Sequence, residues 1–241
     1  MSLPKKSQPY YYDLHIHTAL SPCANDDMSP NDIVGMSILN GLDIIAITDH
    51  NTIANANSVI KAAQAAAQQH GKELIVLPGI EVSTAEEVHV LCLFDSIDKA
   101  QFFDAEMNSF YNTLPNREDI FGAQLLFDSD DSVTGNLERM LIAPTLISFD
   151  HLYQIAQKYD GAFIPAHIDR DSFSVTSNLG FLPPHLNINT IELASESESV
   201  NYPDKNIVYS SDAHQLWAIN EKKHFLMLPE LSAKTVIKAL Q

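Results

Sequence analysis

Cysteine is scarce in this chain, where only Cys23 and Cys92 occur among 241 residues. Two cysteines cannot form a disulfide framework, and a chain of this length buries a core large enough to fold without one. Free thiols are typical of a reducing compartment. We therefore expect a cytoplasmic protein without disulfide bonds.

Long hydrophobic runs are also missing. Stretches such as residues 43–47 and 74–77 fall far short of the ~20 apolar residues that a membrane-spanning helix needs. Residues 1–12 contain two lysines but no apolar core and no cleavage-type ending, so we expect no signal peptide. These absences predict that no membrane is among the partners.

Basic residues are few, because 14 Lys and Arg stand against 31 Asp and Glu, which gives a net charge of −17. A surface of this sign disfavours binding to long nucleic acids or to anionic lipids. A small phosphorylated substrate remains compatible with it, because bound cations reverse the charge locally.

The chain alternates short apolar runs with helical segments, and no internal repeat is visible. This alternation predicts an α/β protein with parallel strands, either a barrel or a doubly wound sheet. The expected strands are residues 11–16, 44–48, 73–77, 88–94, 161–165, 190–193 and 206–210. The expected helices are residues 30–40, 51–70, 98–112, 148–159 and 232–240.

Residues 95–148 form a stretch that is longer than a simple connection between a strand and a helix. No Pro- or Gly-rich linker flanks it, so we interpret it as an insertion or lid within one domain that spans residues 1–241. We expect this segment to cover part of the functional site.

Ten histidines are present, and several of them lie at strand ends. His15 and His17 are two residues apart, so strand geometry points both side chains to one face. Such a pair alone is also found on half-exposed strands that bind nothing. The pattern becomes specific because acidic residues and histidines recur at the ends of nearly all expected strands, where α/β folds build their sites. The further members are Asp49, His50, Glu81, His89, His167, Asp212 and His214.

This set of side chains has the composition of a metal site. Imidazoles and carboxylates without paired thiolates suit Mn, Zn or Fe. The candidates outnumber the ligands that one ion uses, so we expect two to three divalent metal ions.

Taken in order, these motifs resemble those of the PHP (polymerase and histidinol phosphatase) family. The resemblance runs from about residue 11 to residue 220, and it implies a distorted (β/α)7, TIM-like barrel. It also implies phosphoesterase activity and a trinuclear metal centre at the C-terminal ends of the strands. The motifs are Asp13-Leu-His-Ile-His-Thr18, Ile47-Thr-Asp-His-Asn51, Pro78-Gly-Ile-Glu-Val82, His89, Ala166-His167 and Ser211-Asp-Ala-His214.

The resemblance also implies which residues hold each ion. Glu81 bridges the first two ions, and Glu81, Asp212 and His214 are the residues that we expect to be catalytic. The first ion would take His15, His17, Glu81 and Asp212; the second Glu81, His89 and His167; the third His50, His214 and one ligand from the loop after His17.

That loop, residues 21–28, offers more than one candidate ligand. Asp26, Asp27 and Cys23 all occur there, and the loop is longer than the short turn common in the family. We favour Asp27, because it abuts the start of the helix that begins at Pro30. An ordinary loop cysteine is the preferred interpretation of Cys23.

Arg170 is the candidate substrate-binding residue, because it follows the expected ligand His167 by three positions. Its guanidinium can donate two parallel hydrogen bonds to a phosphate. The competing interpretation is a surface arginine paired with Asp169 or Asp171. Asp13 and Asp49 are candidates for orienting the imidazoles. We interpret the remaining histidines as non-ligands, namely His70, His151, His185 and His224.

These expectations combine into a metal-dependent phosphoesterase that acts on a phosphomonoester or a nucleotide. Two ions bridged by Glu81 would hold a hydroxide that attacks phosphorus. Two alternatives remain open: a metal-dependent amidohydrolase or deaminase, whose barrel also begins with a His-x-His strand, and a non-catalytic PHP module stabilised by metal. The pattern assigns neither the substrate nor the oligomeric state.

Overall fold

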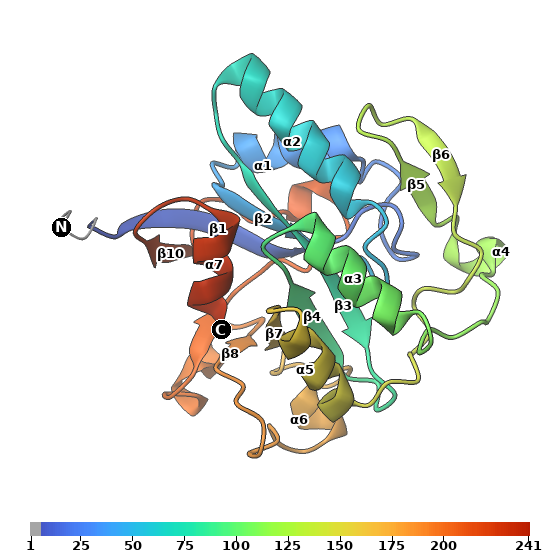
Figure 1. Ribbon diagram of the computed structural model, residues 1–241, viewed down its shortest axis with the longest axis vertical. Coiled ribbons are helices and arrows are strands. Elements are labelled where there is room, and N and C mark those ends of the chain that lie inside the picture. Colours follow the sequence, from blue (N-terminus) through green and yellow to red (C-terminus); the bar gives the residue numbers. More distant parts are fainter. Residues whose placement is uncertain (1–5) are drawn as a thin grey trace.

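The computed structural model describes residues 6–241, in which strands and helices alternate along most of the chain (Figure 1). Its strands are β1 (Gln8–Ile16), β2 (Ile44–Ile47), β3 (Ile75–Ser83), β4 (His89–Leu93), β5 (Leu125–Phe127), β6 (Val133–Asn136), β7 (Ala162–Pro165), β8 (Thr190–Glu192), β9 (Asn206–Val208) and β10 (Phe225–Leu228). Its helices are α1 (Pro30–Leu39), α2 (Ala56–His70), α3 (Ile97–Met107), α4 (Glu118–Phe121), α5 (Phe149–Lys158), α6 (Val175–Asn178) and α7 (Ala233–Leu240), with the short 3-10 helices η1 (Glu196–Asn201) and η2 (Leu216–Ala218).

The main sheet is curled and has the strand order β10-β1-β2-β3-β4-β7. The parallel pair β8–β9 continues the curve next to β7, where the Ile168 amide donates to the Glu192 carbonyl at 3.0 Å. The chain after β9 returns to β1, where the His17 amide donates to the Ala213 carbonyl at 2.9 Å. The result is an α/β, barrel-like fold, which confirms the expected fold class.

Not every strand pair is parallel, contrary to the sequence-based expectation. β1, β2 and β3 are parallel neighbours, but β4 is antiparallel to both β3 and β7. Residues 84–88 connect β3 to β4 and are too few for the crossover helix that a parallel pair needs. This reversal brings the first residue of β4, His89, beside Ser83 at the C-terminal end of β3.

Local sequence signals set the helix boundaries. The Ser29 side chain accepts a hydrogen bond from the Asp32 amide at the start of α1, and Pro30 occupies the first helical position. Gly71 ends α2 with a φ of 70°, a left-handed conformation that glycine adopts without steric cost. α2 begins at Ala56 and not at residue 51, whose φ of 52° is outside the helical range.

The helices cover the outside of the curled sheet, with α1 and α2 over β1–β3 and α3 and α5 farther along (Figure 1). α5 buries Phe149, Leu152, Ile155 and Ala156 at helical spacing, which is the apolar face expected of a covering helix. In the described part of the chain, no helix is both long and apolar enough to cross a membrane.

The segment 95–148 consists of two different parts. Its first part is α3, whose residues Ala100, Phe103 and Met107 are buried in the core, as in an ordinary covering helix. Its second part contains the β5–β6 hairpin, which is held to the start of α2 because the Ser58 hydroxyl donates to the Phe127 carbonyl at 2.7 Å. The chain then passes through Ile142, which lines the cavity at the strand ends.

Candidate metal centre

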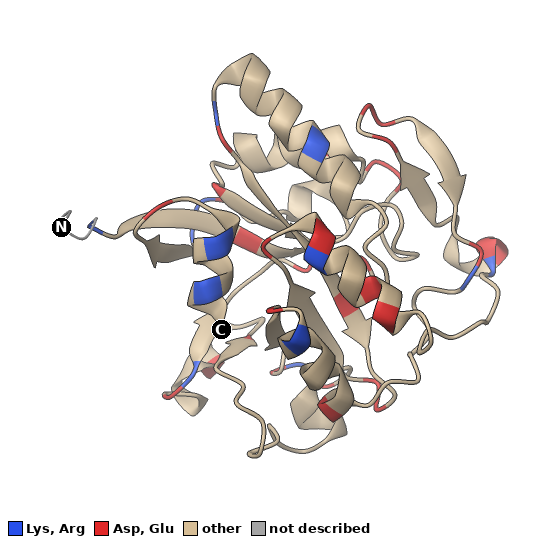
Figure 2. Cartoon of the chain, in the orientation of Figure 1, with Lys and Arg blue, Asp and Glu red and all other residues tan. Residues whose placement is uncertain are grey.

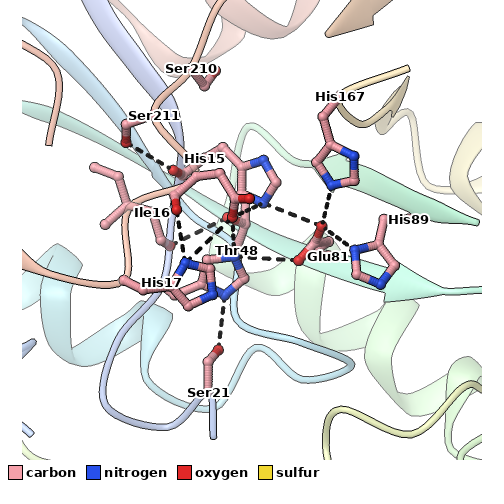
Figure 3. Close-up of polar contacts among 12 residues, drawn as sticks. His15, Ile16, His17, Ser21, Thr48, Glu81, His89, His167, Ser210 and Ser211 are labelled. Atoms are coloured by element: carbon pink, nitrogen blue, oxygen red, sulfur yellow. Dashed lines mark hydrogen bonds and ion pairs between the residues drawn. The ribbon is translucent and has the colours of Figure 1, made fainter. Parts of the chain in front are cut away.

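One end of the curled sheet gathers the candidate ligands (Figure 3). They come from the end of β1, the middle of β3, the start of β4 and the loops that follow β2, β7 and β9. Glu81 lies within β3, because this strand continues to Ser83 and does not end near residue 77 as the sequence suggested. The residues brought together are His15, His17, His50, Glu81, His89, His167, Asp212 and His214.

Glu81 is the centre of this group and is 1% exposed. Figure 3 shows its carboxylate pointing between the rings of His15, His17, His89 and His167. The distances from its carboxylate oxygens to the nearest ring nitrogens are 2.8 Å for His50 and His89, 3.3 Å for His17, and 3.4 Å for His15 and His167.

These buried atoms lack hydrogen-bond partners, even though they lie close together. Both Glu81 carboxylate oxygens and the Nε2 atoms of His15 and His17 are buried without a hydrogen bond of acceptable geometry. Leaving such groups unsatisfied costs about 1–3 kcal/mol each, so native proteins rarely retain them. Lone pairs directed at a common point are the arrangement that a cation satisfies. The residues present therefore fit a metal centre.

The ligand atoms fall into three overlapping groups among the described residues. The first group matches the set implied for the first ion. The second group contains His50 in place of His167, which the resemblance implied. The third group contains His17 in place of the implied ligand from the loop after His17. The groups are His15, His17, Glu81 and Asp212; His50, Glu81 and His89; and His17, His50 and His214.

Asp27 does not join these groups. The Met28 side chain is fully buried, and the Met28 amide donates to the Asn25 carbonyl at 3.0 Å, so the loop turns with Asp26 and Asp27 exposed. Cys23 is the loop residue that approaches the cluster, with 3.5 Å between its Sγ and Nε2 of His50. It still lies outside the three groups.

Partner groups fix the orientation of the β1 imidazoles. Glu192, at the end of β8, lies 3.0 Å from Nδ1 of His15, which leaves Nε2 directed at the cluster. Ser21 Oγ lies 2.9 Å from Nδ1 of His17 and donates to the Asp49 carboxylate at 2.8 Å. Carboxylates that hold metal-binding histidines in this way fix the ring and its tautomer.

Glu192 was missed by the sequence analysis, although the signal was present. It is the acidic residue at the end of an expected strand, the same position that singled out the other candidates. Asp49 orients His17 only through Ser21, whereas Asp13 contacts no imidazole. Asp13 instead accepts hydrogen bonds from the Ser211 and Asn220 amides, which fastens the last strand-end loop to β1.

The charges of the cluster shift the protonation of its members. Burial alone would lower the pKa of His17 and of His50, but the carboxylates beside them raise both to about 9. Burial would raise the pKa of Glu81, but the surrounding imidazoles hold it well below its usual range. Burial and the nearby His17 lower the pKa of His214 to about 3. The buried carboxylates thus favour positive charge at this end of the sheet.

Arg170 lies at the entrance of the cluster and is 43% exposed. Its Nη1 is 2.6 Å from the Asp212 carboxylate, so it pairs with a candidate ligand and not with its sequence neighbours. Asp169 is occupied elsewhere, because it accepts from the Ala194 and Ser195 amides at 2.8 Å.

The cluster opens into a cavity of about 200 Å³. Arg170 supplies the fixed positive charge among the residues that line it. Elsewhere in the described chain, Lys and Arg are scattered over several helices and loops (Figure 2). The lining residues are His50, Glu81, His89, Ile142, His167, Arg170, Ser172, Phe173, Asp212 and His214.

The histidines interpreted as non-ligands lie outside the three groups. His185, for example, is exposed and lies 2.7 Å from the Asp150 carboxylate, and the ring of His224 lies next to that of Tyr209.

A family model of the PHP domain matches residues 13–168, which is more than half of the chain. The chain therefore belongs to the PHP domain family. This membership confirms the resemblance drawn from the motifs. The matched region contains the end of β1, all of β2–β7 and every candidate ligand except Asp212 and His214.

Two curated relatives match about a third of this chain. A 5'-3' exoribonuclease of Haemophilus influenzae is 36% identical over 85 residues, which are 34% of this chain and 28% of that protein. The 5'-3' exoribonuclease Rnm of Salmonella typhimurium is 36% identical over 78 residues, 32% of this chain and 24% of that protein. The matched stretch thus spans only about a quarter of the length of these relatives.

Solved structures share the fold at low sequence identity. The lesion-specific endonuclease PfuEndoQ of Pyrococcus furiosus superposes with a TM-score of 0.67 at 16% identity, over 97% of this chain and 56% of that one. A putative metal-dependent phosphoesterase of Bifidobacterium adolescentis gives a TM-score of 0.56 at 16% identity, over 97% of this chain and 96% of that one. An amidohydrolase of Chromobacterium violaceum with bound sulfate gives a TM-score of 0.54 at 14% identity, over 95% of this chain and 96% of that one. At these identities, the likeness describes the fold alone.

Proposed function

We propose that this protein is a metal-dependent phosphoesterase that hydrolyses a small phosphorylated substrate, either a phosphomonoester or a nucleotide. The observation that carries the proposal is the Glu81 carboxylate, buried among five imidazoles without a hydrogen bond of its own. Membership of the PHP family and the single arginine at the cavity entrance support the same reaction class.

The three groups of ligand atoms would hold two to three divalent ions, of which Mn, Zn and Fe suit imidazole and carboxylate donors. When bound, such ions act as Lewis acids that lower the pKa of water and neutralise charge on a phosphoryl group. Glu81, Asp212 and His214 would hold these ions at the cavity and are the residues that we propose to be catalytic. Asp27 remains a ligand predicted from the sequence alone.

Arg170 would bind the phosphoryl oxygens. Its guanidinium lies at the cavity entrance and presents further N–H donors beyond the one that contacts Asp212. The cavity is smaller than the roughly 300–1,000 Å³ that encloses a whole drug-sized ligand. It accommodates the phosphoryl group and the atoms next to it, while the rest of the substrate extends outward.

A second candidate is hydrolysis at the end of an RNA or DNA strand. The local identity to two 5'-3' exoribonucleases favours it. The acidic chain, with its dispersed Lys and Arg, argues against long contacts along a nucleic-acid backbone. A short terminal segment is compatible with both observations, because it needs only the cavity and Arg170.

The deciding experiment assays purified, Mn-loaded protein against phosphomonoesters, nucleotides, bis-p-nitrophenyl phosphate and 5'-phosphorylated RNA. We expect release of phosphate or nucleotide that stops when a chelator is added and resumes with Mn. Equal turnover of long RNA and small esters would replace the small-substrate proposal with the strand-end candidate. Ammonia release from an amide or nucleobase would instead support the amidohydrolase alternative, and no turnover with full metal content would support a non-catalytic module.

A further inference from the structure

Phe173 has an unusual backbone conformation beside the metal centre. Its φ is 55°, in the left-handed region that bulky side chains rarely adopt. Its side chain is nevertheless 46% exposed, so burial in the core does not offset the strain. Residues held in such conformations by the surrounding structure cluster at functional sites.

Neighbouring hydrogen bonds hold this backbone in place. The Phe173 carbonyl accepts from the amide of His89, the first residue of β4, at 2.9 Å. The next residue, Ser174, is fully buried, and its hydroxyl donates to the Arg170 carbonyl at 2.7 Å while capping α6. The loop thus presents Phe173 from a fixed position between Arg170 and a metal-ligand candidate.

The Phe173 ring lies parallel to the imidazole of His89, with ring centroids 4.9 Å apart and an interplanar angle of 21°. The ring also lines the cavity, together with Ile142 from the segment 95–148, which is 37% exposed. The cavity therefore combines an apolar rim, Phe173 and Ile142, with a polar floor of Glu81, Asp212 and the imidazoles.

We propose that Phe173 is a specificity-determining residue whose ring stacks on a planar, nucleobase-like group carried next to the substrate phosphate. This inference rests on the proposed phosphoesterase function and adds the class of leaving group. The phosphate would lie on the polar floor near Arg170, and the planar group would lie against the apolar rim. Such a group is present in a free nucleotide and in the terminal nucleotide of a strand.

The competing explanation is that Phe173 only packs against His89 and so positions a metal ligand. The two explanations differ in their dependence on the substrate. A stacking surface matters for a planar leaving group and not for an aliphatic one, whereas a displaced His89 impairs both.

The test compares the Mn-loaded wild type with Phe173→Ala, Phe173→Leu and the control Phe181→Ala. Phe181 is an exposed phenylalanine, 61% accessible, that does not line the cavity. The substrates are 2-aminopurine riboside 5'-monophosphate, a 5'-phosphorylated dinucleotide with 2-aminopurine first, and glycerol 2-phosphate. The readouts are kcat and KM, the metal content, and the quenching of 2-aminopurine fluorescence on binding.

We expect Phe173→Ala to lower kcat/KM for the planar substrates by about 10- to 100-fold, mainly through KM, since aromatic stacking on a base has this magnitude. The value for glycerol 2-phosphate should change less than about threefold, the metal content should stay the same, and Phe181→Ala should resemble the wild type. If Phe173→Ala has a lower kcat/KM on the mononucleotide alone, a free nucleotide is the substrate class. If its kcat/KM is lower on the dinucleotide as well, the end of a strand is the substrate class.

An equal loss on all substrates, accompanied by loss of metal in Phe173→Ala and its recovery in Phe173→Leu, would overturn the inference in favour of packing. Unchanged quenching in Phe173→Ala would overturn it even if hydrolysis is observed. If the wild type hydrolyses none of the substrates, the phosphoesterase proposal fails, and the quenching measurement alone decides whether Phe173 binds the base.

Discussion

The buried cluster and the loops around its cavity satisfy their polar groups in different ways. In the cluster, Glu81 and His15 come from strands, are excluded from solvent, and have atoms without hydrogen-bond partners. The rim of the cavity also includes Arg170, which comes from a loop, is partly exposed, and already has a partner in Asp212. The buried cluster thus provides the atoms that a cation would satisfy, whereas the exposed loop residues provide the groups that we propose to contact a substrate.

This comparison predicts that changes in the cluster abolish metal binding, whereas changes at the rim alter substrate use. The largest effect is expected for Glu81→Gln. The change removes the negative charge at the centre of five imidazoles, so repulsion between neighbouring bound cations is no longer offset. We expect loss of at least one metal equivalent and a fall in kcat on the order of a thousandfold, a scale typical of removing a central catalytic group.

Elemental analysis and thermal unfolding with and without Mn check this prediction. Ions at 100 times their dissociation constant stabilise the wild type by about 2.7 kcal/mol, and the variant should lose most of the resulting rise in Tm. Glu73→Gln is the matched control, because Glu73 is exposed two residues before β3. Full metal content in Glu81→Gln would show that the cluster binds its ions without a bridging carboxylate.

A smaller effect is expected for Glu192→Gln, which keeps the shape of the side chain beside His15 but removes its charge. The glutamate also accepts from the His167 amide at 3.0 Å, so it positions two parts of the site. Loss of such an orienting carboxylate lowers metal affinity by about 10- to 100-fold. Titration with Mn should show a larger dissociation constant with the number of sites unchanged. An unchanged affinity would show that Glu192 does not orient the metal ligands.

At the rim, Arg170→Ala should lower kcat/KM by about 10- to 100-fold, because a charge-assisted hydrogen bond contributes on the order of 1.5–3 kcal/mol. The metal content should not change, which separates Arg170 from the ligands. Arg170→Lys should restore only part of the loss, since an ammonium group cannot donate two parallel hydrogen bonds. Wild-type kinetics in Arg170→Ala would instead show that this arginine only pairs with Asp212.

The same division explains what the sequence could predict. The helices and central strands followed from apolar runs and from caps such as Ser29 and Gly71, and His15 and His17 followed from strand periodicity. The antiparallel placement of β4 could not be read from its apolar run, because a strand buried on both faces looks the same in either direction. The antiparallel direction of β4 instead follows from the short connection between β3 and β4, residues 84–88.

The loops were harder to predict, because their side chains are placed by contacts distant in sequence. Arg170 was expected near the site, but its pairing with Asp212, 42 positions away, depends on the return of the chain to β1. Phe173 gave no signal in the sequence, since its importance lies in a backbone angle and in stacking on His89. The hairpin β5–β6 was missed because its strands are short and β6 is polar, whereas β10 was missed although Phe225–Leu228 is a continuous apolar run.

The smallest effect is expected for Asp27→Asn, and it tests the boundary between the two regions. The sequence favours Asp27 as a ligand of the third ion, but the structure exposes it and brings Cys23 closer, 3.5 Å from His50. Because the Asp27 carboxylate is solvated and outside the ligand groups, its neutralisation should change the metal content by less than half an equivalent and kcat/KM less than about twofold, within the small range of surface substitutions. His50→Ala is the comparison variant, since it removes a member of two groups and should lose at least one equivalent. Loss of a full equivalent in Asp27→Asn would show that the loop folds inward when the third ion binds, and that the rim contributes to the metal centre after all.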